Sequence, residues 1–352
     1  MQATRSSRLP VTVVTGFLGS GKTTLLRHLL QNSGQRLAVL VNEFGEVGID
    51  GGLLRSCGIC DDDGSAVVEL ANGCLCCTVQ DDFLPTMERV LERADQLDGI
   101  VIETSGLALP EPLLQAFQWP EIRHRTRVSG VVTVVDGQAL AQQQVVFDAQ
   151  ALEQQRLDDP SLDHDDAIED LFLEQLEVAD LVLISRADLL SAADLQQATD
   201  HLQTQLVQLP LEQVPPHLLT RRGVIDPALV LGLDRVDVTG HGPADGEHDH
   251  HHHDHSHPEL LSSSVELTGH WSREAVESVL RQSIQPMGLL RLKGRVPIAG
   301  KALPLQVQAV GSRLECWYED DGGAPDQLQL VLIGERPDGP ALHDQLQGLM
   351  QA

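Results

Sequence analysis

Short apolar runs alternate with longer helix-like stretches along the first two thirds of the chain. The runs are rich in Val, Ile and Leu, which is typical of parallel strands that are buried on both faces of a sheet. We predict such strands at Val11–Thr15, Leu37–Val41, Ala66–Leu70, Ile100–Ile102, Gly130–Val135 and Leu181–Ile184. Helices are predicted between them, at Lys22–Gln31, Phe83–Ala94, Ile168–Glu177 and Ala192–Val207. This order predicts an α/β fold with a doubly wound, mainly parallel sheet.

The pattern changes at Gly240–Pro258, a stretch of Gly, Pro, Asp and His that has the composition of a disordered linker. Beyond it, strands are predicted at Ser264–Leu267, Leu289–Leu292, Leu305–Val310 and Leu328–Ile333, and amphipathic helices at Ser272–Ser283 and Ala341–Met350. One helix after the first strand and one at the end predict a small α+β domain with an antiparallel, ferredoxin-like sheet. The predicted divisions are a first domain at 1–235, a His-rich linker at 236–260 and a C-terminal domain at 261–352.

The charge balance excludes several classes of function. The 352 residues include 24 Lys and Arg but 52 Asp and Glu, which gives a formal net charge of −28. This acid excess argues against nonspecific binding to nucleic acid or to an anionic membrane. No apolar run approaches the ~18 residues that a membrane-spanning helix needs. The polar segment Met1–Arg8 leads straight into the first predicted strand, so no signal peptide is visible and we expect a cytoplasmic protein.

The segment Gly16–Thr23 reads GFLGSGKT and fits the P-loop pattern G-x-x-x-x-G-K-[ST] between a predicted strand and a predicted helix. Its glycines let backbone N–H groups close around phosphate oxygens at the start of the helix. Lys22 is expected to bridge the β- and γ-phosphates, and the hydroxyl of Thr23 to hold Mg²⁺. The predicted nucleotide-binding residues of this segment are Gly16, Gly19, Ser20, Gly21, Lys22, Thr23 and Thr24.

Two further segments follow buried strands and complete the predicted nucleotide site. Glu103 can bind Mg²⁺ through water or orient an attacking water, and the N–H of Gly106 can face the γ-phosphate. The second segment is Ser185-Arg186-Ala187-Asp188, which stands where guanine-selecting proteins carry Asn-Lys-x-Asp. Asp188 can accept hydrogen bonds from the guanine base, and Arg186 can lie on the face of the base as lysine would. Ser185 is shorter than asparagine, so guanine preference is expected with weaker discrimination against ATP.

Five of the six cysteines lie within 21 residues, which indicates metal or redox chemistry rather than a disulfide scaffold. Cys74, Cys76 and Cys77 can converge on one soft ion such as Zn²⁺ or Co²⁺, and three sulfurs leave a fourth position open. The alternative is a group of buried structural cysteines in a tight loop. The pair Cys57 and Cys60 is compatible with a second metal site, a reserve ligand set or an incidental pair. Cys316 is expected to be a core or surface thiol.

Seven of the 15 histidines fall in the stretch His248–His257, which is interleaved with Asp249 and Asp254. A flexible array of imidazoles and carboxylates can bind divalent metals weakly, because any subset of the side chains can coordinate. We therefore expect capture or buffering of metal by this stretch rather than a defined site; the alternative is a merely solvated linker.

With these motifs the sequence resembles the CobW family of P-loop GTPases, which is related to the nickel-insertion GTPases of hydrogenase and urease maturation. The resemblance covers nearly the whole chain: GFLGSGKTTLL at Gly16–Leu26, NEFGEVGID at Asn42–Asp50, NGCLCC at Asn72–Cys77, and ETSGLALPEPL at Glu103–Leu113. DDFLPTMERVLER at Asp81–Arg93 and VDGQAL at Val135–Leu140 are similar to the branch associated with cobalamin biosynthesis. The chain departs from the family at Ser185-Arg186, where the family has Asn-Lys.

The resemblance implies a GTP-dependent metallochaperone that delivers Co²⁺ toward the cobaltochelatase of cobalamin biosynthesis, or serves another metalloenzyme client. It implies the metal ligands Cys74, Cys76 and Cys77, and a switch region at Asn42–Asp50 in which Glu43 contacts the catalytic water and Asp50 contacts Mg²⁺. The implied cofactors are GTP and Mg²⁺, and the protein is expected to be a monomer or a dimer that depends on nucleotide or metal.

Our hypothesis for the mechanism is that Mg²⁺ and the γ-phosphate order the switch and close the thiolate site, and that hydrolysis loosens the metal. Intrinsic turnover is expected to be slow, because no arginine finger can be assigned from the sequence. Three alternatives stay open: a chaperone of the same family that carries Zn²⁺, a metal-storage or sensing module, and a small-molecule kinase.

Overall fold

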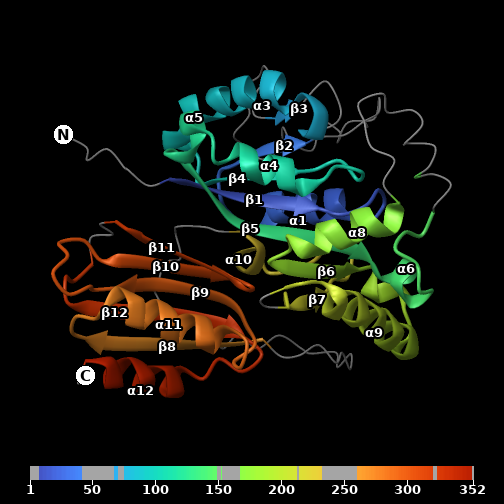
Figure 1. Cartoon of the computed structure of the whole chain (residues 1–352). Helices are drawn as coiled ribbons and strands as arrows, with labels where there is room; N and C mark the ends of the chain where they lie inside the picture. The colour runs from blue at the N-terminus through green and yellow to red at the C-terminus, as the bar shows by residue number, and fades with distance from the viewer. Residues whose placement is uncertain are drawn as a thin grey trace, which may run out of the picture.

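The computed structural model describes residues 8–41, 67–69, 75–148, 152, 167–211, 214–231, 260–319 and 323–350. Within these ranges the chain forms two sheets, each with its own helices (Figure 1). None of the described helices combines the length and the apolar character required to cross a membrane. The predicted switch region at Asn42–Asp50 and residues 236–259 of the predicted linker lie outside the described residues.

The first sheet has seven strands in the order β3-β2-β4-β1-β5-β6-β7, and all of its pairings are parallel. The strands are β1 (Leu9–Thr15), β2 (Leu37–Val41), β3 (Val67–Glu69), β4 (Gly99–Glu103), β5 (Thr126–Asp136), β6 (Leu181–Ser185) and β7 (His217–Leu219). The six predicted strands are confirmed. β7 was not predicted, because it is only three residues long and follows two prolines.

Helices cover both faces of this sheet, as a doubly wound fold requires. They are α1 (Lys22–Asn32), α3 (Leu75–Glu92), α4 (Pro110–Ala116), α5 (Pro120–Arg123), α6 (Gly137–Ala141), α8 (Ile168–Glu177), α9 (Ala192–Gln208) and α10 (Pro227–Val230). Helix α1 packs its buried leucines against Val14, Val39 and Val134 on one face. Helices α3 and α4 cover the other face of β1, β2 and β4, and α8 and α9 continue that layer over β5 and β6. The fold class predicted for the first domain is therefore confirmed.

Helix α3 begins at Leu75, eight residues before the predicted start at Phe83. Pro85 explains why the sequence places the start too late. Proline is usually found in the first turn of a helix, which favours a start near Phe83, but Pro85 lies inside α3. The earlier start places the backbone of Cys76 and Cys77 in the first turn of α3.

The second sheet has five strands in the order β11-β10-β9-β12-β8, and all of its pairings are antiparallel. Its elements are β8 (Leu261–Thr268), α11 (Arg273–Ile284), β9 (Leu289–Val296), β10 (Leu305–Val310), β11 (Arg313–Tyr318), β12 (Gln327–Gly334) and α12 (Gly339–Leu349). The predicted small α+β domain is confirmed. It has one strand more than predicted, β11, which forms a hairpin with β10. Because β12 lies between β8 and β9, the domain keeps one split β-α-β unit of a ferredoxin-like fold.

The second sheet packs against the first domain through both apolar and charged contacts. Leu290 and Ile333 belong to the apolar cluster that also contains the buried leucines of α1. Beside them, Nε of Arg313 lies 2.6 Å from the carboxylate of Asp180, which precedes β6. Arg127 of β5 pairs with Glu315 at 3.6 Å and lies 4.1 Å from the ring centre of Trp317. The C-terminal domain therefore contacts the amino ends of β5 and β6, whereas the motif residues lie at the carboxyl ends of β1, β4 and β6.

Candidate nucleotide-binding site

The loop between β1 and α1 holds the predicted phosphate-binding segment in a conformation that requires glycine. Gly16, Gly19 and Gly21 have φ angles of 135°, 74° and 105°. A Cβ atom at Gly16 would lie 2.1 Å from the carbonyl oxygen of Val134. No other residue fits this position without displacing β5, so the backbone of the loop can approach a ligand closely.

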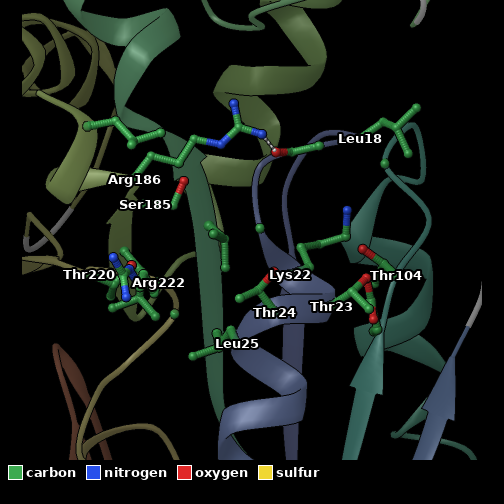
Figure 2. Close-up of a pocket in the computed structure, with 18 of the residues that line it drawn as sticks. Leu18, Lys22, Thr23, Thr24, Leu25, Thr104, Ser185, Arg186, Thr220 and Arg222 are labelled. Carbon is green, nitrogen blue, oxygen red and sulfur yellow. Dashed lines mark hydrogen bonds between the residues drawn. The ribbon is translucent and has the colours of Figure 1, made fainter. Parts of the chain in front are cut away.

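The side chain of Lys22 binds the backbone of this loop. Its buried Nζ donates hydrogen bonds to the carbonyl oxygens of Gly16 at 2.8 Å and of Phe17 at 3.1 Å. Figure 2 shows the ammonium group of Lys22 pointing away from α1, into the space beneath Leu18. Phosphate oxygens that entered this space would be new acceptors for the same ammonium group.

Thr23 and Glu103 meet beside Lys22. The hydroxyl of Thr23 donates a hydrogen bond of 3.1 Å to Oε1 of Glu103, whose side chain is buried. The next residue, Thr104, is fixed to β1 because its N–H donates to the carbonyl of Val14 and its hydroxyl donates to that of Thr15. A buried carboxylate and a hydroxyl in contact are the oxygen ligands that Mg²⁺ prefers, so the residues present fit this ion.

Gly106 packs directly on the phosphate-binding loop. A Cβ atom at this position would lie 2.5 Å from the backbone nitrogen of Leu18. The carbonyl of Gly106 accepts a hydrogen bond of 3.2 Å from the side chain of the buried Gln175. The segment after β4 is therefore held against the loop by backbone contact.

The predicted base-reading segment follows β6 and is tied to the phosphate-binding loop by Arg186. Arg186 has a left-handed backbone with φ of 56°, and its NH2 donates a hydrogen bond of 2.7 Å to the carbonyl of Gly19. The dashed line in Figure 2 is this bond. Asp188 accepts a hydrogen bond of 3.2 Å from the backbone N–H of Arg222. Ser185 Oγ is buried and has no hydrogen-bond partner among the described residues.

These segments surround a cavity of about 400 Å³. The predicted residues in its wall are Gly19, Gly21, Lys22, Thr23, Thr24, Glu103, Gly106, Ser185, Arg186 and Asp188. Gly16 and Ser20 are not in that wall, and Ser20 lines a smaller neighbouring pocket. Thr220, Arg222 and Gly223 do line the cavity but were missed. These three residues follow the carboxyl end of β7, at the edge of the sheet where the other cavity residues lie, so recognition of β7 as a strand would have indicated them.

The predicted cargo site lies largely outside the described residues. Glu43, Asp50, Cys57, Cys60, Cys74 and His248–His257 fall there, and the side chains of Cys76 and Cys77 are not described. In the described parts of the chain, no group of three or more His, Cys, Asp or Glu side chains could hold a metal ion. Cys316 packs on the core of the second domain, where burial and the nearby Glu277 raise the pKa of its thiol to about 12.

Comparison with protein families gives two matches that together span most of the chain. The nucleotide-binding domain of CobW/HypB/UreG matches residues 10–210, and the C-terminal domain of the cobalamin synthesis protein CobW matches residues 261–350.

Two curated relatives match the chain over nearly its full length. A zinc chaperone CobW from a Sinorhizobium species is 40% identical over 98% of this chain and 96% of its own. A zinc chaperone CobW from Pseudomonas aeruginosa is 43% identical over 97% of this chain and 91% of its own. Among solved structures, the Zn(II)-bound YjiA GTPase from Escherichia coli aligns over 97% of this chain and 99% of its own, with 24% identity and a TM-score of 0.41.

Proposed function

The chain belongs to the CobW/HypB/UreG family of P-loop GTPases, and on that premise we propose that it carries a transition-metal ion to a metalloenzyme client and holds this cargo most tightly with Mg²⁺–GTP bound. One observation carries the proposal: β1, β4, β2 and β3 are adjacent and parallel. The phosphate-binding loop follows β1, Glu103 ends β4, and the Cys-x-Cys-Cys motif comes shortly after β3. The carboxyl ends of parallel strands meet at one edge of a sheet, where ligands bind.

The described residues would bind different parts of the nucleotide: the phosphates, the Mg²⁺ ion and the base. The backbone of Gly19 and Gly21 surrounds the phosphates, and Lys22 exchanges its two carbonyl partners for phosphate oxygens. Thr23 and Glu103 would hold Mg²⁺, which when bound neutralises charge that develops on the phosphates. Asp188 accepts hydrogen bonds from the guanine base. Slow intrinsic turnover stays a prediction from the sequence, in which no arginine finger can be assigned.

Coupling between nucleotide and cargo needs only a modest free energy. A tenfold change in metal affinity corresponds to ~1.4 kcal/mol, which lies within the usual range of allosteric coupling. β4 lies between β1 and β2, and β2 pairs with β3. A segment that follows β2 and is ordered by the γ-phosphate would therefore act between the phosphate site and the thiolates of Cys74, Cys76 and Cys77.

We infer Zn²⁺ as the cargo, because the two full-length relatives are zinc chaperones by name and thiolates bind zinc well. Co²⁺ is the second candidate, supported by the motifs of the cobalamin-associated branch; its client would be a cobaltochelatase. Three thiolates do not reject zinc in favour of cobalt, since affinity rises from Co²⁺ toward Zn²⁺ in most sites. Selection of cobalt would therefore depend on the client and on metal supply.

The test is a competition titration of Zn²⁺ and of Co²⁺ against a chromophoric chelator, with Mg²⁺ and either a non-hydrolysable GTP analogue or GDP. We expect at least tenfold tighter metal binding with the GTP analogue. Cys76→Ser should abolish this difference, and Cys316→Ser, which removes a thiol of the other domain, should leave it intact. Equal metal affinities in the two nucleotide states would overturn the gating, and tight metal binding by Cys76→Ser would overturn the assigned ligands.

A further inference from the structure

Asp136 lies outside the residues predicted to bind the nucleotide, yet it contacts one of them. It ends β5, and its Oδ2 lies 2.8 Å from NH1 of Arg186. Its Oδ1 accepts a hydrogen bond of 2.9 Å from the N–H of Gln138 and thereby caps the start of α6. The side chain of Asp136 is only 6% exposed. The carboxylate is thus fixed on one side by a helix and pairs on the other with the base-reading segment.

We propose that Asp136 is a positioning residue for guanine-nucleotide recognition, which it serves by holding Arg186 against the carbonyl of Gly19. This inference rests on the proposed function, because it needs a guanine nucleotide in the cavity. We call the three groups the Asp136 clamp: the carboxylate of Asp136, the guanidinium of Arg186 and the carbonyl of Gly19.

The fork of an arginine suits this arrangement. NH1 faces Asp136 and also donates to Oε1 of Gln138 at 3.4 Å, and NH2 faces Gly19, so one rigid guanidinium binds acceptors on both sides at once. A lysine has a single nitrogen on a flexible stem and cannot reproduce this fixed spacing. The presence of Arg186 where the family has lysine is therefore explained by the buried carboxylate of Asp136, which provides the second acceptor.

The clamp fixes two parts of the cavity. Its first effect is on Arg186, a residue of the cavity wall, whose guanidinium is fixed between Asp136 and the carbonyl of Gly19. Its second effect is on the phosphate-binding loop, whose Gly19 carbonyl is joined to the end of β6 across 167 residues of sequence. The hydroxyl of Ser185 makes no such bond among the described residues, so Arg186 takes over the connection that a longer side chain at 185 would make.

The test uses equilibrium binding of fluorescent GDP and ADP analogues to the full chain. Asp136→Asn keeps an oxygen that can cap α6 but removes the negative charge that faces Arg186. Arg186→Met keeps the apolar stem and removes both bonds of the clamp. We expect each variant to weaken GDP binding at least tenfold and to lower the preference for GDP over ADP at least fivefold. The double variant should bind GDP within twofold of either single variant.

The matched control is Asp338→Asn, which changes the helix-capping aspartate of α12 in the other domain, where Asp338 accepts from the N–H of Ala341 at 2.9 Å. It should leave GDP affinity and base preference unchanged. Thermal unfolding without nucleotide checks that each variant folds. Should Asp136→Asn not fold, Arg186→Met carries the test alone.

The outcomes separate this inference from the proposed function. A wild-type chain that binds GDP no better than ADP would remove the guanine specificity on which both depend. Normal guanine preference in the wild type together with unchanged binding by Arg186→Met would overturn the clamp and leave the function standing. Independent, multiplying losses in the double variant would show that Asp136 does not act through Arg186.

Discussion

The hydroxyl of Thr23 donates a 3.1 Å hydrogen bond to the carboxylate of Glu103, although 80 residues separate the two in the sequence. Thr23 stands in the first turn of α1, and Glu103 is the last residue of β4. Pairing of β1 with β4 brings these two element ends together. The contact joins the phosphate-binding loop to a central buried carboxylate.

We predict that Glu103→Gln slows GTP hydrolysis by about 100-fold or more. The amide can still accept the hydrogen bond of Thr23, but it carries no charge for Mg²⁺ and no basic oxygen for a water. GDP affinity should fall far less, because most of the binding contacts come from the loop backbone and the base. Single-turnover hydrolysis and GDP titration separate the two effects. Glu111→Gln, an exposed change on α4, is the control, and a hydrolysis rate equal to wild type in Glu103→Gln would refute the role.

We predict that Gly106→Ala weakens nucleotide binding at least tenfold and destabilises the fold by about 1 to 3 kcal/mol. The new methyl group would meet the backbone of Leu18 at 2.5 Å, so either the loop or the segment after β4 must move. Gly348→Ala is the matched control, since a Cβ there meets nothing within 4 Å and favours the helix α12. Nucleotide titration and thermal unfolding measure both quantities. Unchanged affinity in Gly106→Ala would mean that the loop adapts without loss.

The phosphate-binding loop was predictable because its chemistry is local. Strand, glycines, lysine and helix follow one another within Val11–Gln31, so the motif and its context can be checked together in the sequence. The strands of the first sheet were predictable for a similar reason, since a strand that is buried on both faces has a nearly continuous apolar sequence. β7 was not predicted because it is too short to give such a run. The cavity residues Thr220 and Gly223, which follow it, were missed for the same reason.

Contacts between distant segments could not be predicted. The bond from Arg186 to Gly19 exists because β5 and β6 are neighbours and because the loop exposes that carbonyl. No periodicity in the sequence encodes either fact. The sequence suggested that Arg186 lies on the base, and the structure adds what holds its charged end. The strand β11 was missed because Leu314 is its one buried position, and the partly buried Cys316 and Tyr318 that pack on the core give only a weak apolar alternation.

We predict that deletion of Gly240–Pro258 lowers the number of metal ions bound per chain but leaves the tightest site unchanged. The histidines of this segment offer many interchangeable, weak ligand sets, whereas three thiolates offer one strong set. Replacement of the segment by Gly and Ser of equal length is the control for chain connectivity. Isothermal titration with Zn²⁺ gives stoichiometry and affinity together. Loss of the tight site on deletion would favour a storage or sensing module over a chaperone.

The ion pair of Asp180 and Arg313 at the contact between the domains predicts that the free energy of unfolding depends on pH. Burial raises the pKa of Asp180 to about 6 from 3.8, and the nearby Arg313 limits the rise. Since the folded state binds this proton more tightly than the unfolded state, Asp180 favours folding at low pH. Its ionisation in the unfolded chain then lowers the free energy of unfolding as pH rises from about 4 to about 6, on the order of 3 kcal/mol in all. Above pH 6 the contribution is constant.

Arg313→Met removes the cation that opposes this shift, so the pKa of Asp180 should rise further and the decline in unfolding free energy should continue above pH 6. The pKa of Glu315 is raised by burial, and the charges of Arg127 and Arg313 oppose this rise. Loss of Arg313 should therefore raise the pKa of Glu315 as well. Chemical unfolding at several pH values, compared with the exposed change Arg273→Met, isolates the effect. If Arg313→Met and wild type show parallel curves between pH 6 and pH 8, then Arg313 does not control the ionisation of Asp180 at this interface.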